Sequence, residues 1–442
     1  MSRPGALLLA LLASCAWPRR GEPPGEARLR IIIETDAGGD PDDEQSLVRF
    51  LLYANEWEVE GIIANRPQAR ERENRNPERT GLGIVRAMLR AYRECHPNLV
   101  RHDRRYPAPE RLWERTVAGY EETDDGVDLI IRAVDSPDPR PVWFSNWGTD
   151  KGSASSCLKR ALDRVLQERG QPGYARFKER LRLSSSDQFG DHTFLPPPWT
   201  LWVDAFRPEL EGKRWYHRFS ALTATAGGFD VERDVRTGHG PLGALYPVNT
   251  THKQKEGDTM SFLYFVPTGM NDPGEPGWGS WGGRYGPQDD SGHAYFWANR
   301  KDSWEGTTDR DNVLRRWAVD LQNDFRARLD WCVKGPGEAN HPPEARVEGP
   351  LRRTVKAGSR VELDGSGSRD PDGDGLALRW FAYPEAGTFA GTISIEGADS
   401  PTASFVAPAV SSARTVHVLL AVTDRGAPPL ARYRRIVVTV EP

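Results

Sequence analysis

Four carboxylates are crowded into residues 36–43, in the order Asp-Ala-Gly-Gly-Asp-Pro-Asp-Asp. Like charges this close repel one another, so the arrangement costs stability unless a hard cation or substrate hydroxyl groups compensate for it. Carboxylate oxygens are the ligands that Ca²⁺ prefers, and a carboxylate can also take a proton from water. The segment is therefore a candidate site. The alternative is an acidic helix start, in which aspartates cap free backbone amides.

A strand and a helix are predicted to position this segment. The isoleucines at 31–33 predict a buried strand before it, and the apolar positions 47, 48, 50, 51 and 52 fall on one face of a helix after it. The carboxylates then lie beyond the carboxyl end of a strand, which is where open α/β sheets bind their ligands.

The surrounding residues 30–333 alternate short apolar runs with helical patterns, which is typical of an α/β domain with a mostly parallel sheet and flanking helices. Residues 184–305 are rich in Gly, Pro and Trp with little periodicity, and so much loop in a compact domain is usually functional. The clearer strands are expected at 31–33, 59–64, 141–145 and 262–266, and helices at 46–53, 81–94, 125–134, 153–167 and 311–332.

A second domain is predicted after a Pro/Gly-rich linker at residues 334–343. Residues 344–442 contain five or more short alternating segments separated by turns, which predicts an all-β immunoglobulin-like sandwich with Trp380 in its core. For the acidic loop at 370–374 we expect a plain Asx/Gly turn, because it lacks the closing glutamate of an EF-hand, and a calcium site is the alternative.

Composition and the amino terminus limit the classes of partner. The 442 residues carry a formal net charge of −4 with mixed signs, so we expect no nucleic-acid partner. Residues 1–21 have the pattern of an export signal. Two alternatives remain, an ordinary cleaved signal and a lipobox that makes Cys15 the lipidated first residue. Contact with a membrane is expected only through that lipid anchor.

The acidic segment resembles the nucleoside-hydrolase superfamily, in which D-x-D-P-G-x-D-D follows the first strand. Asp36, Asp42 and Asp43 match its first, seventh and eighth positions. Gly38 stands where the family has an aspartate that binds calcium, and Asp40 is a candidate metal or substrate ligand in its place. The resemblance is nearer to a branch of secreted bacterial cellulose-binding proteins with a nucleoside-hydrolase-like domain, and it continues at 46–54, 61–64, 140–143, 240–246, 256–263, 271–273 and 278–284.

The resemblance implies one Ca²⁺ ion and assigns its surroundings. Asp36, Asp43 and Asp258 correspond to metal-binding positions, and Asp42 corresponds to the general base. Asp258 lies in a segment similar to the family's late H-D-x-x-x-A, and a helix cap is the alternative for it. Gly257 replaces the histidine that protonates the leaving group. Residues 361–380 in turn resemble the polycystic-kidney-disease (PKD) type of immunoglobulin-like module of secreted bacterial enzymes.

Sugar contacts are expected from polar and aromatic side chains, because aromatic faces stack on the apolar side of sugar rings. The alternatives are a helix cap for the first of these residues and a packed loop for the tryptophans. The candidates are Asn146, Asn271, Asp272, Trp278, Trp281 and Arg284.

Two functions follow as hypotheses. The first is an exported, calcium-dependent hydrolase of N-glycosyl or O-glycosyl bonds, whose ligand is a carbohydrate or nucleoside-like molecule. The second is a non-catalytic protein that binds cellulose or another polysaccharide, suggested by Gly38 and Gly257 at two family positions. In both cases the protein is expected to be secreted, periplasmic or lipid-anchored at the bacterial cell envelope.

Overall fold

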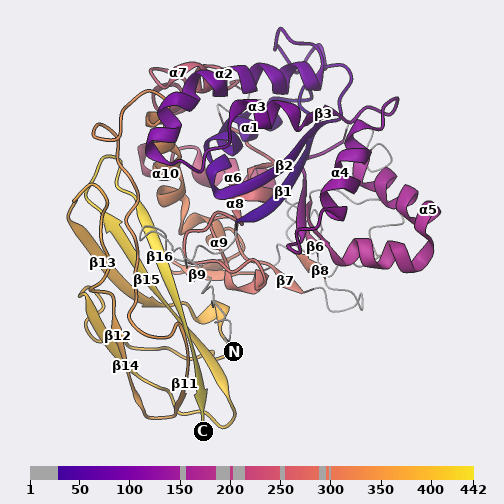
Figure 1. Ribbon diagram of the computed structural model, residues 1–442. Helices are drawn as coiled ribbons and strands as arrows, with labels where there is room; N and C mark the ends of the chain where they lie inside the picture. The colour runs from indigo at the N-terminus through magenta and orange to yellow at the C-terminus, as the bar shows by residue number, and fades with distance from the viewer. Residues whose placement is uncertain are drawn as a thin grey trace, which may run out of the picture.

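The computed structural model describes residues 28–149, 156–185, 200–202, 215–248, 254–287, 295–297 and 300–442. They form an α/β domain and an all-β domain, the latter standing to one side and coloured orange to yellow in Figure 1. The expectations for residues 1–21, with Cys15, fall outside these ranges. Within the described ranges, no helix is both long enough and apolar enough to cross a membrane.

The main sheet explains where a site can form. Among the described residues its strand order is β3-β2-β1-β4-β5-β6-β8-β7, and every pair is parallel except β7 with β8. The order reverses direction between β1 and β4, and a crevice opens beyond the carboxyl ends of strands at such a point. The bounds are β1 Leu29–Thr35, β2 Trp57–Ala64, β3 Thr116–Ala118, β4 Val142–Asn146, β5 Leu181–Ser185, β6 Thr200–Trp202, β7 Gly286–Pro287 and β8 Tyr295–Trp297.

Helices cover both faces of this sheet (Figure 1). In β1, Ile31 and Ile33 belong to the core on the side of α1, α2 and α10, whereas Ile32 belongs to the core on the side of α4 and α5. A strand buried on both faces needs a continuous apolar run, which the isoleucines supply. The helices are α1 Asp42–Leu52, α2 Gly81–His102, α3 Pro109–Glu114, α4 Asp125–Asp135, α5 Cys157–Glu179, α6 Trp215–Thr223, α7 Gly240–Ala244, α8 Thr259–Leu263, α9 Asn312–Arg315 and α10 Ala318–Asp330.

The strand predicted at 262–266 is wrong, because this segment includes the end of helix α8 and a turn. Phe262 is fully buried and packs against Phe50 and Trp147, with both pairs of ring centroids 5.4 Å apart. A short apolar run that is buried all round has no periodicity that separates strand from helix. The single helix predicted at 311–332 is divided into α9 and α10.

The C-terminal domain is the predicted sandwich. A four-stranded sheet of order β11-β16-β15-β13 faces a two-stranded sheet of β12 and β14. Trp380 is 2% exposed and lies in the core between them. The strands are β11 Arg352–Lys356, β12 Arg360–Asp364, β13 Leu376–Ala382, β14 Thr402–Val406, β15 Arg414–Asp424 and β16 Ala431–Glu441.

The two domains share a core. Tyr383 and Tyr433 of the sandwich are buried in the same apolar cluster as α1, α2 and α10. The Tyr383 hydroxyl donates to Asp302 over 2.5 Å, and the Tyr433 backbone N–H donates to the Thr268 carbonyl over 2.9 Å. The sandwich is therefore packed directly against the α/β domain.

A buried ion pair fixes the loop before α8 against α1. Glu256 and Arg49 are both fully buried, with Nε–Oε2 and Nη2–Oε1 distances of 2.5 and 2.9 Å. The Tyr246 hydroxyl donates to Glu256 over 2.8 Å. The Gln45 side-chain oxygen accepts the backbone N–H groups of Lys255 and Glu256 over 2.7 and 3.0 Å. Residues 255–258 are thus held beside the start of α1.

Breaking this ion pair should destabilise the whole chain. Arg49→Met leaves the Glu256 carboxylate buried without its cation, which typically costs about 3–5 kcal/mol. The matched control is Arg70→Met, because the Arg70–Glu73 pair is 51% exposed at both side chains and such pairs contribute about 0–1 kcal/mol. The measurement is the free energy of unfolding in urea. Equal losses in the two variants would contradict the role given to the buried pair.

The close approach of the two domains at Gly269 gives a second test. Gly269 has φ +85°, and a Cβ there would lie 1.9 Å from the Tyr433 carbonyl oxygen. Gly306 has φ +79° with no atom within 4 Å of the same position. Both Ala variants carry the strain of a positive φ, about 1 kcal/mol, but only Gly269→Ala also forces the sandwich away. We expect a larger fall in melting temperature for Gly269→Ala, and an equal fall would refute the tight docking.

Candidate active site

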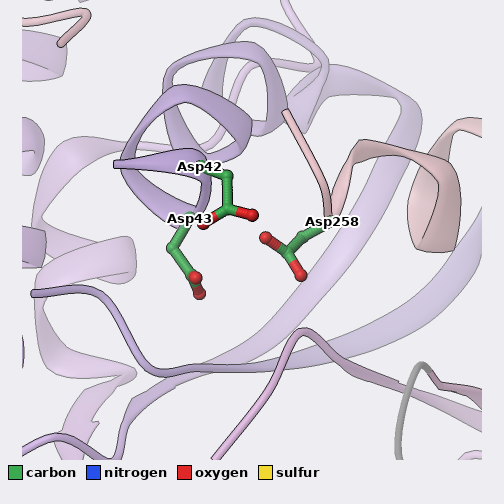
Figure 2. A group of neighbouring side chains, drawn as sticks. All are labelled: Asp42, Asp43 and Asp258. Atoms are coloured by element: carbon green, nitrogen blue, oxygen red, sulfur yellow. The ribbon is translucent and has the colours of Figure 1, made fainter. Parts of the chain in front are cut away.

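Three carboxylates from distant parts of the chain meet beyond the carboxyl end of β1. Asp42 and Asp43 open helix α1, and Asp258 directly precedes α8 (Figure 2). One carboxylate oxygen of each lies within 4.8 Å of the other two. Asp43 and Asp258 are buried, and the Asp42 side chain is 14% exposed. Carboxylates at this separation suit a hard divalent cation.

Asp43 lies at the centre of the negative charge. Its Oδ1 accepts the Thr35 hydroxyl over 2.5 Å and the Asp36 backbone N–H over 3.1 Å. Burial raises the pKa of Asp43 well above its ordinary value, and the charges of Asp258 and Asp36 raise it further. Without a compensating cation, ionising Asp43 is costly.

Asp36 directly follows β1, the strand that lies between β2 and β4 in the sheet. Its carboxylate forms an ion pair with Arg66, which follows β2, and its backbone oxygen accepts Arg66 Nε over 3.0 Å. Gly148, just after β4, has φ +136°, and a Cβ there would lie 3.2 Å from Asp36 Oδ1. The chain after β4 thus passes directly over the Asp36 carboxylate.

A lysine joins the other two acidic residues of the loop. Lys255 Nζ forms ion pairs with Asp40 and with Asp42 Oδ2, the latter at 3.0 Å. Its side chain is 15% exposed. The ammonium group therefore fixes the carboxylate of Asp42 at the edge of the three-carboxylate group.

Gly38 cannot simply be replaced by the family's aspartate. Its φ is +98°, and a Cβ there would lie 3.1 Å from the Ala69 Cβ and 3.2 Å from the Ile84 Cδ1. The backbone at this position faces packed apolar atoms. A side chain at position 38 would therefore be strained and would require Ala69 and Ile84 to shift.

The side-chain amides of Asn146 and Asn65 lie at the carboxyl ends of the neighbouring strands β4 and β2. Asn146 Oδ1 accepts the Gly148 N–H over 2.7 Å, and Asn65 Nδ2 donates to the Gly148 carbonyl over 3.0 Å. Within the described ranges, the buried atoms Asn146 Nδ2 and Asn65 Oδ1 have no hydrogen-bond partner. These two polar atoms are thus buried and, among the described residues, unpaired at the ends of β4 and β2.

The remaining sugar-contact candidates lie against the C-terminal domain. Trp278 packs edge-on to His417 with centroids 5.0 Å apart, and its carbonyl accepts Arg435 Nη2 over 2.9 Å. Arg284 is 5% exposed and donates to Asp302 over 2.9 Å and to the Glu385 carbonyl over 2.7 Å. These contacts connect the two domains.

The other members of this group are placed similarly. Trp281 is fully buried, with the Arg432 guanidinium 5.6 Å from its ring centroid. Asn271 donates to the Tyr264 carbonyl over 2.9 Å, and Asp272 pairs with Arg352 at 3.3 Å. The structure does not bring residues 271–284 into the three-carboxylate group.

Sequence reasoning missed three residues that touch the acidic loop, namely Thr35, Arg66 and Lys255. Two of them carried a signal, because Thr35 ends β1 and Arg66 follows the neighbouring parallel strand β2. Parallel strands end at the same edge of a sheet, so polar residues there converge. Lys255 directly precedes the 256–258 segment, but nothing in the sequence indicated that its side chain would contact Asp40 and Asp42.

Comparisons with known proteins identify the family and the fold of both domains. The family model for the nucleoside hydrolase-like domain of cellulose-binding Sde182 matches residues 30–285. The model for the C-terminal domain of cellulose-binding protein Sde0182 matches residues 360–440. A solved structure of a nucleoside hydrolase-related hypothetical protein from Saccharophagus degradans, associated with carbohydrate metabolism, is similar at 31% identity with a TM-score of 0.70. The match covers 94% of this chain and 100% of that one.

Other similarities are weak. The PKD domain from the KIAA 1837 protein matches at 18% identity and a TM-score of 0.17, over 22% of this chain and 89% of its own. The effector protein XOO4466 matches at 11% identity and a TM-score of 0.31, over 69% of this chain and 95% of its own. Curated protein sequences give no significant match.

Replacing Asp43 should stabilise the metal-free protein. In Asp43→Asn, Oδ1 still accepts the Thr35 and Asp36 groups, while the buried charge disappears. We expect the free energy of unfolding at about pH 8, in chelator, to rise by about 1–3 kcal/mol, the usual cost of an uncompensated buried polar group.

The pH dependence follows from the raised pKa of folded Asp43. Its destabilising effect is complete above that pKa and is lost as pH falls to the unfolded value of about 3.9. The advantage of Asp43→Asn should therefore shrink toward about pH 4. Asp163→Asn, at an exposed position of α5, is the control. A loss of stability at about pH 8 would refute the proposed repulsion.

Proposed function

The chain belongs to the family of Sde182 cellulose-binding proteins with a nucleoside hydrolase-like domain, and we propose that it is an exported hydrolase of glycosidic bonds. The observation that carries the proposal is the convergence of Asp42, Asp43 and Asp258 beyond the carboxyl end of β1, where the strand order reverses toward β4. The proposed substrate is a carbohydrate or nucleoside-like molecule with an N- or O-glycosyl bond. Export is supported by the pattern of residues 1–21.

Calcium fits the residues present. Asp43 and Asp258 offer carboxylate oxygens within 4.8 Å of each other, and Asp36 adjoins Asp43; these three would hold the ion, with Asp42 beside them as the base. Burial, and after it the charges of Asp258 and Asp36, raises the pKa of Asp43, and this supports a cation as the compensating partner. When bound there, Ca²⁺ supplies that charge and attracts sugar hydroxyls and water.

Asp42 is the proposed general base. Its carboxylate stands at the exposed edge of the group, held by Lys255, and takes a proton from a water molecule. The oxygen of that water bonds to the anomeric carbon while the bond to the leaving group breaks. The leaving group departs with the bonding electrons and gains its proton from solvent, because Gly257 offers no acid. Asn146 and Asn65 have free amide atoms for substrate hydroxyls within the described ranges.

A second function is favoured by one observation. Lys255 pairs with both Asp40 and Asp42, so part of the negative charge is already neutralised. Together with the missing leaving-group acid at position 257, this fits a protein that holds a polysaccharide without cleaving it. The choice between the two functions depends on turnover.

The test is turnover with and without chelator, using nucleosides in one series and cello-oligosaccharides in the other. Asp42→Asn should lower kcat by about 10²–10⁴-fold, the usual contribution of a general base, with little change in ligand affinity. Asp163→Asn should retain full activity because it lies on the surface of α5. Binding to cellulose with no product in either series, equal in wild type and Asp42→Asn, would contradict the hydrolase and support the second function.

A further inference from the structure

A second group of carboxylates lies at the end of the sandwich nearest the linker. Single carboxylate oxygens of Asp370, Asp372 and Asp374, in the loop between β12 and β13, lie within 4.8 Å of one another. Asp370 Oδ1 accepts the backbone N–H groups of Asp372 and Asp374 over 2.9 and 3.0 Å. These bonds form an Asx turn, which by itself needs no ligand.

Buried oxygens beside this loop distinguish it from a plain turn. Asp424, at the end of β15, is 3% exposed, and Asn340 of the linker is 7% exposed. Among the described residues, Asp424 Oδ2, Asn340 Oδ1 and Asp370 Oδ2 are all buried without a hydrogen-bond partner. Leaving a buried polar atom unpaired is costly, so three together indicate a missing ligand.

These oxygens belong to one locality. Asn340 Nδ2 donates to Asp424 Oδ1 over 3.0 Å, so the two side chains are in contact. Asp424 is the strand partner of Leu376, which lies two residues after Asp374, and the backbone N–H of His341, next to Asn340, donates to Asp372 over 2.7 Å. Asp424 Oδ1 is already used by the N–H groups of Gly426 and Leu430, which leaves Oδ2 for another partner.

The charge at this locality is uncompensated. In the described ranges, the His341 ring is the only side chain in an ion pair with any of the four aspartates, contacting Asp372 at 2.9 Å. No lysine or arginine of those ranges pairs with Asp370, Asp374 or Asp424. Four carboxylates and one amide oxygen form an all-oxygen set of the kind that hard cations prefer.

We propose that Asp370, Asp372, Asp374 and Asp424, with the side-chain oxygen of Asn340, bind a divalent cation of the Ca²⁺ type. This site is separate from the one at Asp43 and Asp258, because it lies in the other domain. The Asx turn expected from the sequence is present, and the proposed cation would bind to it.

The site ties the linker to the sandwich. The Asn340 carbonyl accepts Trp331 Nε1 over 2.9 Å, and His341 Nε2 lies 2.8 Å from Nδ1 of His102 in α2. The linker is thus attached to the α/β domain on one side and to the acidic loop on the other. Cation binding at Asp370–Asp374 stabilises the connection between the domains.

Calcium binding to the full-length chain tests the proposal. Equilibrium dialysis with Ca²⁺ should show that Asp370→Asn and Asp424→Asn each bind one ion fewer than wild type. Both substitutions keep the Oδ1 acceptors, so the fold is retained, and circular dichroism checks this. Asp399→Asn, an exposed acidic position of the same domain, should bind as wild type does.

Asp258→Asn separates the two sites. In that background Ca²⁺ should still raise the melting temperature, and adding Asp424→Asn should abolish the rise. If Asp370→Asn and Asp424→Asn bind as much Ca²⁺ as wild type, or if Asp258→Asn alone removes all binding, the second site does not exist. Loss of an ion in Asp424→Asn with an unchanged site at Asp258 supports it.

Discussion

The buried ion pair between Arg49 and Glu256 is the interaction on which the site depends. It joins α1 to a segment 207 positions later in the chain, and both partners are fully buried. Moving the loop that carries Asp258 would separate this pair, and leaving either charge buried and unpaired would strongly destabilise the fold. Glu256 also has φ 47°, an uncommon value for a residue other than glycine, which the surrounding hydrogen bonds maintain.

The Arg49–Glu256 pair holds together carboxylates that repel one another. Repulsion among Asp36, Asp43 and Asp258 favours separation of α1 from the loop before α8. The Arg49–Glu256 pair and the Gln45 contacts oppose that separation at a point only two residues from Asp258. Buried carboxylates in a rigid frame are suited to bind a cation, since the cost of assembling them is met by the fold.

Much of this arrangement follows from the sequence. The sequence places Asp42 and Asp43 beyond the carboxyl end of a strand, as observed. The signals are the isoleucines of β1, the apolar face of α1 and the four carboxylates between them. The alternating segments after the linker predict the sandwich and buried Trp380. These features are local, because each depends on residues that are close in the chain.

What the sequence did not reveal depends on contacts across long separations. Lys255 beside Asp42, and the docking of residues 278–284 on β15 and β16, have no local pattern. The run 262–266 was misassigned because burial on all sides removes periodicity. The sequence of the acidic loop at 370–374 predicts a turn, and only the fold brings Asp424 and Asn340 beside it.

The most direct test of the central claim is a crystal structure of the protein grown with Ca²⁺, with the ion located by its anomalous scattering. The account predicts an ion at the crevice with oxygens of Asp43 and Asp258 at about 2.3–2.6 Å. The contradicting result is a fully ordered crevice that contains no ion at saturating Ca²⁺, with Asp43 and Asp258 hydrogen-bonded to each other through a shared proton.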